Sequence, residues 1–350
     1  MKAKNIYSKS SSFYLDSKKD FFNENQKLLE RAEDQNKLYS SQPNRLNCKI
    51  CKSKLPGEID FTSHGVNYCF CSNCEHLNGC FEDTTSFIDK IYIQEDGNDY
   101  ASNYIDDNYQ KRVSEIYIPK IDFLLNSINT SKISRLLDIG CGSGYFVSAA
   151  ISRGLNAEGI DVNKAMVEYG NQQIRLLNGK SPLSYADERD FFKKIESSDA
   201  DVISAIGVIE HLRLPHMFFD AFKKSSANYL MYSVPMFSLS VIIENVLENV
   251  FPRQLSGGHT HLFTEKSIQI MHEIIRVDPI SYWRFGTDIM DLYRGFMVSL
   301  QRNQVSKKIL ENFENGFGVK IDELQSVLDR NHFCSEIHCV AQKKYKASLY

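Results

Sequence analysis

The chain has 350 residues, and its 41 lysines and arginines nearly balance its 44 aspartates and glutamates, for a formal net charge of −3. This balance, without a long basic tract, argues against strong sequence-independent binding to nucleic acid. No run of about 18 apolar residues is present and no apolar core follows Met1-Lys2-Ala3-Lys4, so we expect neither a membrane span nor an export signal. We therefore expect a cytoplasmic protein whose nine cysteines stay reduced.

Residues 1–45 are rich in serine, lysine, asparagine and aspartate and are predicted to be a polar extension. The first twenty residues carry too little apolar surface to fold alone, whereas residues 21–38 have the spacing of an amphipathic helix. Strand-like segments follow over residues 46–82. The core of so short a segment is too small to be stable without a bound metal. We expect this module to have a core separate from that of the rest of the chain.

Four cysteines of the module form two Cys-x-x-Cys pairs separated by nineteen residues: Cys48 and Cys51, then Cys71 and Cys74. This spacing is typical of a zinc ribbon, in which both pairs direct their thiolates at one tetrahedral ion. A redox pair is the alternative for a single pair, and the second pair favours the metal. Cys69 lies on the same face of a predicted strand as Cys71 and Cys80 lies nearby, so the ligand choice stays open. A closed four-thiolate site is structural, and no catalysis is expected from it.

Residues 83–130 are predicted to be an aromatic, acidic connector ending in a helix near 110–127. Tyr100, Tyr104 and Tyr109 stand in this connector and could close over a bound ligand, although aromatic side chains more often pack than react.

Residues 131–350 show the alternation of strands and helices that is typical of a doubly wound, mostly parallel α/β sheet. Strands are predicted near 135–139, 156–160, 183–186, 200–206 and 228–234, with helices near 144–153, 163–178 and 214–225. The β-prone segments 280–285 and 336–341 are expected to pair as antiparallel final strands. A helical insertion between them, about 287–330, would then form a lid.

The segment after the first of these strands is the most informative. It has the pattern Asp-x-Gly-x-Gly-x-Gly, formed by Asp138, Gly140, Gly142 and Gly144, with Cys141 after the first glycine. Glycines allow a sharp turn, so that a ligand can lie against the backbone and the amino end of the next helix. The dinucleotide fingerprint has its third glycine one residue later, which makes NAD the less favoured ligand.

The ends of the next strands carry further candidates. Asp161, followed by Val162, ends the second strand and can accept hydrogen bonds from a ribose diol. Asp187 follows the third strand, and Ile206 and Gly207 end the fourth. Ligands of open α/β sheets bind beyond the carboxyl ends of the strands, so we expect these residues around one crevice.

Together these segments resemble the nucleoside site of class I S-adenosylmethionine-dependent methyltransferases. The resemblance implies a Rossmann-like fold and S-adenosylmethionine as the cofactor. It also implies that Asp138 lies near the methionine amino group, that the glycine turn holds the amino-acid part, and that Asp187 lies on the adenine side. The same residues show binding rather than turnover, so a noncatalytic nucleoside-binding scaffold remains the alternative.

Methyl transfer by in-line displacement requires a positioned acceptor and a place for its proton. Glu210 and His211 follow the fourth strand at the crevice mouth, and His211 is the first candidate base because histidine titrates near neutral pH. A plain helix start is the structural alternative. His261, in a His-Leu-Phe segment similar to one near the acceptor in this family, is the second candidate, and His259 is expected to be more peripheral. Their His-x-His spacing without a clear carboxylate partner is weak evidence for a metal.

The order of ribbon, tyrosine-rich connector and methyltransferase domain resembles the bacterial sugar C-methyltransferases over about residues 46–285. This resemblance implies that Tyr104, Glu210 and His211 take part in sugar binding and proton removal. It departs after Pro235, since those enzymes carry a longer carboxyl-terminal domain. Four charged residues near the lid are further candidates for contact with a polar substrate: Arg284, Asp288, Asp291 and Arg294.

We therefore predict methyl transfer to a small polar acceptor, such as a nucleotide-linked sugar or another precursor of surface glycans or natural products, with oxygen slightly preferred as the acceptor atom. The rival within the same class is methylation of RNA or protein, with the ribbon as the recognition module.

Overall fold

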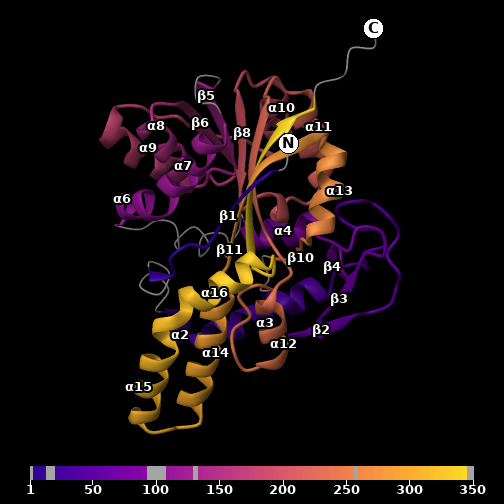
Figure 1. The fold of residues 1–350 in the computed structure, drawn as a ribbon. Helices are drawn as coiled ribbons and strands as arrows, with labels where there is room; N and C mark the ends of the chain where they lie inside the picture. The colour runs from indigo at the N-terminus through magenta and orange to yellow at the C-terminus, as the bar shows by residue number, and fades with distance from the viewer. Residues whose placement is uncertain (1–2, 13–19, 93–107, 129–132, 256–258, 345–350) are drawn as a thin grey trace.

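The computed structural model describes residues 3–12, 20–92, 108–128, 133–255 and 259–344. The main body is built on one eight-stranded sheet flanked by helices on both faces (Figure 1). Its strand order is β1-β11-β12-β9-β8-β5-β6-β7, and most neighbouring pairs are parallel. The predicted fold class, a mostly parallel α/β sheet of the Rossmann-like kind, is confirmed.

Five strands form the parallel part of the sheet: β5 (Arg135–Ile139), β6 (Asn156–Asp161), β7 (Leu183–Tyr185), β8 (Val202–Ile206) and β9 (Tyr229–Pro235). Successive side chains of a strand point to opposite faces of a sheet. Accordingly, Leu136 packs into one core cluster and Leu137 into another. Both faces are covered, which explains why these strands are continuous apolar runs rather than alternating ones.

Helices α7 (Ile118–Ser127), α8 (Tyr145–Ser152) and α9 (Lys164–Asn178) cover one face, and α10 (Glu188–Ser197), α11 (Pro215–Lys224) and α13 (Glu265–Ile275) cover the other (Figure 1). Among these, α10 is not predicted from the sequence. Its buried face consists of a few side chains, among them Phe191 and Ile195, and Asp187 starts it by accepting a hydrogen bond from the Asp190 amide at 2.9 Å.

The other edge of the sheet is antiparallel. β12 (Glu336–Lys343) lies between β9 and β11 (Val277–Phe285) and is antiparallel to both. β1 (Lys4–Tyr7) pairs in parallel with β11, although its segment was expected to be part of a polar extension. An edge strand needs little apolar surface because its backbone pairing holds it, and the Trp283 indole adds a hydrogen bond to the Ser8 carbonyl at 3.0 Å.

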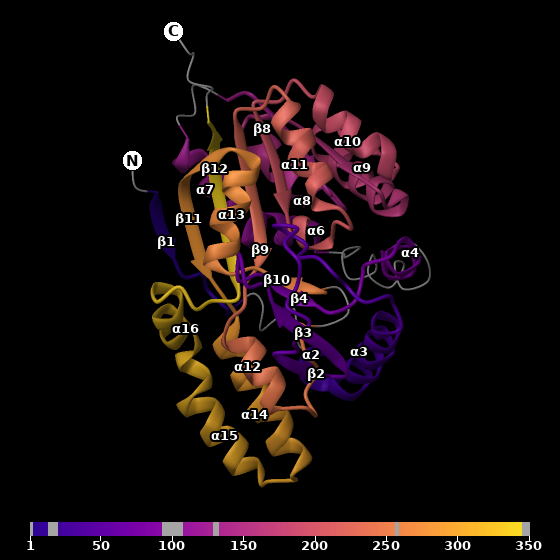
Figure 2. The same cartoon turned by 90° about the vertical axis from the view of Figure 1, so that its right-hand side faces the viewer.

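The cysteine-containing module forms its own antiparallel sheet, ordered β10-β4-β3-β2. β2 (Phe61–Ser63), β3 (Val66–Phe70) and β4 (Leu77–Gly79) come from the module, but β10 (His261–Leu262) comes from beyond β9. Figure 2 shows β10 between the module and the main sheet. The expectation of separate cores is wrong, because buried side chains of the module share one hydrophobic cluster with the main sheet.

Further helices lie at the same end of the sheet as this module in both views (Figures 1 and 2). They are α3 (Asn25–Ser40), α12 (Leu239–Val246), α14 (Asp288–Arg302), α15 (Lys307–Gly316) and α16 (Ile321–Arg330). The last three form the segment that joins β11 to β12. Among the described residues, no helix combines the length and the apolar character that crossing a bilayer requires.

Candidate functional site

The glycine turn joins β5 to α8. Gly140, Gly142 and Gly144 all have positive φ angles, between 52° and 71°, which L side chains rarely adopt. A Cβ atom on Gly144 would also stand 2.6 Å from a methyl carbon of Leu183. The three glycines are therefore required by backbone shape and by close packing at once.

Two carboxylates flank this turn. Asp161, at the end of β6, accepts hydrogen bonds from the Gly142 amide and from the Asn163 amide, each at 2.7 Å. Asp138 is buried beneath the turn, where the Ser204 hydroxyl donates to it at 2.7 Å. Burial raises the pKa of Asp138 to about 7.

A cavity of about 850 Å³ opens beside the turn. Its wall includes eight residues predicted for cofactor binding: Gly140, Cys141, Gly142, Asp161, Val162, Asp187, Ile206 and Gly207. Asp138 and Gly144 lie behind this wall. Pockets for small ligands span about 300–1,000 Å³, so this volume is large enough for a cofactor together with a small acceptor.

Glu210, His211 and His259 meet on another part of the same cavity wall. One potential ligand atom from each lies within 4.8 Å of the others. The Glu210 carboxyl is 4% exposed, and burial raises its pKa to about 8. The His259 and His211 rings are nearly parallel, with centroids 5.3 Å apart, and burial lowers the pKa of His259 to about 4.

His261, the second candidate base, does not line the cavity. His261 stands in β10, fully buried, with its Nδ1 atom 2.7 Å from Nε2 of His76 in the cysteine module. His259, expected to be the peripheral histidine of the two, lines the cavity instead, and His261 does not. Tyr104 and Tyr100 fall outside the described residues. Tyr109 is buried, and its hydroxyl donates to the Ser143 carbonyl at 3.1 Å.

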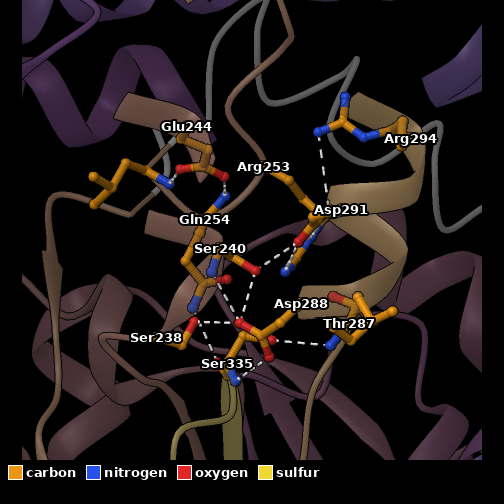
Figure 3. Close-up of polar contacts among 12 residues, drawn as sticks. Ser238, Ser240, Glu244, Arg253, Gln254, Thr287, Asp288, Asp291, Arg294 and Ser335 are labelled. Atoms are coloured by element: carbon orange, nitrogen blue, oxygen red, sulfur yellow. Dashed lines mark hydrogen bonds and ion pairs between the residues drawn. The ribbon is translucent and has the colours of Figure 1, made fainter. Parts of the chain in front are cut away.

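A further wall of the cavity includes Arg253, Thr287 and Ser335, none of which the sequence singles out. Figure 3 shows the network behind it. Arg253 donates to Asp291 at 2.7 Å, and Ser335 donates its amide to Asp288 at 2.9 Å. The two aspartates thus hold wall residues in place rather than lining the cavity themselves.

The remaining two charged candidates also stay out of the cavity lining. Arg294 donates to the Phe251 carbonyl at 2.7 Å, and Arg284 forms an ion pair with Glu265 at 2.9 Å. All four charged candidates therefore interact with other residues of the protein and do not line the cavity. No sequence motif marks the residues that they position.

The four cysteine sulfurs gather at one point of the module: Cys48, Cys51, Cys71 and Cys74. The Sγ atoms of Cys48 and Cys74 are 3.5 Å apart, as are those of Cys51 and Cys71. The two hairpins that carry them have the same hydrogen bonds, since the amide four residues after each first cysteine donates back to that cysteine's carbonyl. Cys69 and Cys80 lie outside this cluster, beside each other.

Comparison with known proteins finds matches to the part of the chain that contains the parallel strands. Residues 109–273 match the model of a protein family described as a methyltransferase domain. A stretch of 146 residues is 26% identical to the sphingolipid C9-methyltransferase of Candida albicans, and this match covers 38% of the chain and 28% of that relative.

Two solved structures are similar in outline. The magnesium protoporphyrin IX methyltransferase of Synechocystis PCC 6803, determined with bound SAH, has a TM-score of 0.48 at 11% identity, covering 75% of this chain and 100% of that one. An S-adenosylmethionine-dependent methyltransferase from Archaeoglobus fulgidus has a TM-score of 0.42 at 18% identity, covering 68% and 100%.

Residues 109–273 thus match the model of a methyltransferase domain. The sheet order and the glycine turn agree with that match.

Proposed function

We propose that the protein transfers a methyl group from S-adenosylmethionine to an oxygen atom of a small polar acceptor. One observation carries the proposal: a single cavity holds the glycine turn with Asp161 on one part of its wall and the Glu210, His211 and His259 cluster on another. S-adenosylmethionine supplies the electrophilic methyl group. The chain holds the acceptor in line with it and manages the acceptor's proton.

In this proposal Asp161 accepts hydrogen bonds from the ribose diol, and Asp138 lies nearest the methionine ammonium. The turn residues Gly140, Cys141 and Gly142 contact the amino-acid part. Val162, Asp187, Ile206 and Gly207 surround the nucleoside. Gly144 does not line the cavity, and its role is to allow the backbone shape of the turn.

Replacing Asp161 by alanine is expected to weaken SAH binding by about 1.5–3 kcal/mol, or roughly 10- to 150-fold, because a charged hydrogen-bond acceptor is lost. Isothermal titration calorimetry measures this loss, and circular dichroism controls for folding because Asp161 also accepts the Gly142 amide. Unchanged SAH affinity would remove Asp161 from the ribose contact, and preference for NAD over SAH would contradict the cofactor assignment.

The pKa of Asp138 predicts a pH dependence of cofactor binding. Its carboxyl is substantially protonated below about pH 7 because burial raises its pKa. An ammonium ligand binds the ionised form, so SAH affinity should fall by about tenfold per pH unit below that pKa and level off above it. Calorimetry between about pH 5.5 and pH 7.5 measures the slope. Asp138→Asn should bind SAH more weakly and without this slope; a sloping Asn variant would assign the titration to another group.

The acceptor is proposed to be a nucleotide-linked sugar or a similar anionic glycan or natural-product precursor. Arg31, Lys120 and Arg253 line the cavity, and cationic side chains suit a phosphate-bearing acceptor. Incubating the protein with methyl-labelled S-adenosylmethionine and pools of nucleotide sugars, followed by mass spectrometry, tests this class. Label found only in lipid, RNA or protein would redirect the acceptor assignment while leaving the methyl transfer intact.

We also propose that the four clustered cysteines bind one structural zinc ion. Tetrahedral zinc with Zn–S bonds of about 2.3 Å places its sulfurs roughly 3.8 Å apart, close to the 3.5 Å between the paired sulfurs here. All four positions are taken by thiolates, so this ion has no open position for a substrate.

A further inference from the structure

Glu210 is a buried carboxylate of the cavity wall, and its Oε2 atom has no hydrogen-bond partner among the described residues. Its Oε1 atom is 4.0 Å from Nε2 of His211, which is too far for a hydrogen bond. Buried carboxylates are normally paired with a cation or hydrogen-bonded. Lys120 and Lys49 act on the Glu210 carboxyl through charge, but among the described residues neither forms an ion pair with it, so the place around Glu210 is suited to a positive partner.

His259 is oriented as a metal ligand would be. Its Nδ1 atom lies 3.0 Å from the Gln254 carbonyl and donates to it, which leaves the lone pair on Nε2. Histidines that bind metals usually donate their other ring N–H to a carbonyl or carboxylate in this way.

Gln254 is itself firmly held, so the orientation of His259 is fixed. Its side chain donates to the Met236 and Ser335 carbonyls at 2.9 Å each, and its amide donates to Glu244 (Figure 3). The network behind Arg253 and Ser335 thus also sets the direction of a histidine in the cavity.

From this geometry we infer that Glu210, His211 and His259 bind a divalent transition-metal ion, such as Mn²⁺, Fe²⁺ or Zn²⁺, that holds the acceptor oxygen. Two nitrogen ligands and one carboxylate suit these ions and leave positions open for water or substrate. Ligands at about 2.1 Å from an ion stand roughly 3–4.2 Å apart, so the three atoms, all within 4.8 Å of one another, need to close by at most about 1.8 Å.

The ion would acidify an acceptor hydroxyl bound to it, and so replace a side-chain base. In the transfer, the O–H bond breaks and its proton passes to solvent water, the oxygen pair forms the O–C bond, and the C–S bonding pair stays on sulfur. This step rests on the proposed function, whereas binding of the ion does not.

The test uses the full-length protein with its cysteine cluster loaded with zinc. Electron paramagnetic resonance should detect one saturable Mn²⁺ site, and calorimetry a second equivalent of Zn²⁺. His259→Ala and Glu210→Gln should each weaken this site by more than about 100-fold, beyond the loss usual for an outer-shell change. His216→Ala, a histidine outside the cavity lining, should not. Only variants that still bind SAH are compared, so a misfolded variant does not count.

A second measurement needs no variant. Mn²⁺ bound at this site should broaden the methyl resonance of ¹³C-methyl S-adenosylmethionine, because the ion lies in the same cavity. The absence of a second site for both Mn²⁺ and Zn²⁺, or full turnover after chelation that spares the cysteine-bound zinc, would overturn the metal site and leave the proposed function standing. Metal binding without any SAH binding would support the site and count against the proposed function.

Discussion

Replacing His211 by alanine is expected to lower turnover by about a hundredfold or more while leaving SAH affinity nearly unchanged. The expectation follows from the position of His211 on the cavity wall beside Glu210 and His259. In either proposed role, as the base itself or as a ligand of an ion that acidifies the acceptor, His211 would act on the acceptor rather than on the nucleoside. Single-turnover kinetics with labelled S-adenosylmethionine measures the chemical step, and calorimetry with SAH measures the cofactor site.

The matched control is His216→Ala, which should keep near-normal turnover. Loss of SAH binding together with turnover in the His211 variant would make His211 a support of the fold or cofactor pocket. Unimpaired turnover would move the acceptor chemistry to another residue, with Tyr104 the next to substitute. Equal, small losses in the His211, His259 and Tyr104 variants would favour catalysis by positioning alone.

Replacing Cys48 by serine is expected to remove zinc and to destabilise the whole protein, by about 4 kcal/mol or more. Two features extend the effect beyond the module. Buried side chains of the module share a hydrophobic cluster with the main sheet, and β4 pairs with β10, only two residues from His259. Elemental analysis measures the zinc, and thermal unfolding followed by circular dichroism measures the stability.

Cys80→Ser is the matched control, because Cys80 stands in the same module but outside the sulfur cluster, and this variant should keep one zinc per chain. Zinc retained by Cys71→Ser but lost by Cys69→Ser would shift the ligand set. If zinc-free Cys48→Ser unfolds at the same temperature as the unmodified protein, the expectation that loss of zinc destabilises the main sheet is wrong.

Local patterns in the sequence predict the parallel sheet and the turn, because both depend on neighbouring residues. The apolar runs that contain Asp138 and end in Asp161 have the length of buried strands, and glycine is the residue that most readily adopts the backbone angles between them. β1 and β10 are not predictable in this way. Each is a short segment whose strand character comes from pairing with a partner far away in the chain.

The choice between His259 and His261 shows the same limit within the site. Residues two apart lie on one face of an extended chain, so spacing alone does not separate them. Pairing of β10 with β4 buries His261 against His76, while the Gln254 carbonyl fixes His259 in the cavity. The contact with His76 is long-range. The contact with Gln254 spans five residues, but Gln254 is itself held by Glu244 and by the Met236 and Ser335 carbonyls. The positions of Arg253 and Gln254 in the cavity wall likewise depend on hydrogen bonds to Asp291 and Glu244. No local motif links these pairs of residues.

Pairing of β10 with β4 also bears on how the cysteine module can be exchanged. A graft of residues 46–82 into another methyltransferase would leave β4 with an unpaired edge, which is a template for aggregation. A transferable unit must therefore be discontinuous and include the segment around residues 259–262. Such a chimera would carry His259 along with the cysteine module, so exchanging the module would also change the cavity wall of the recipient.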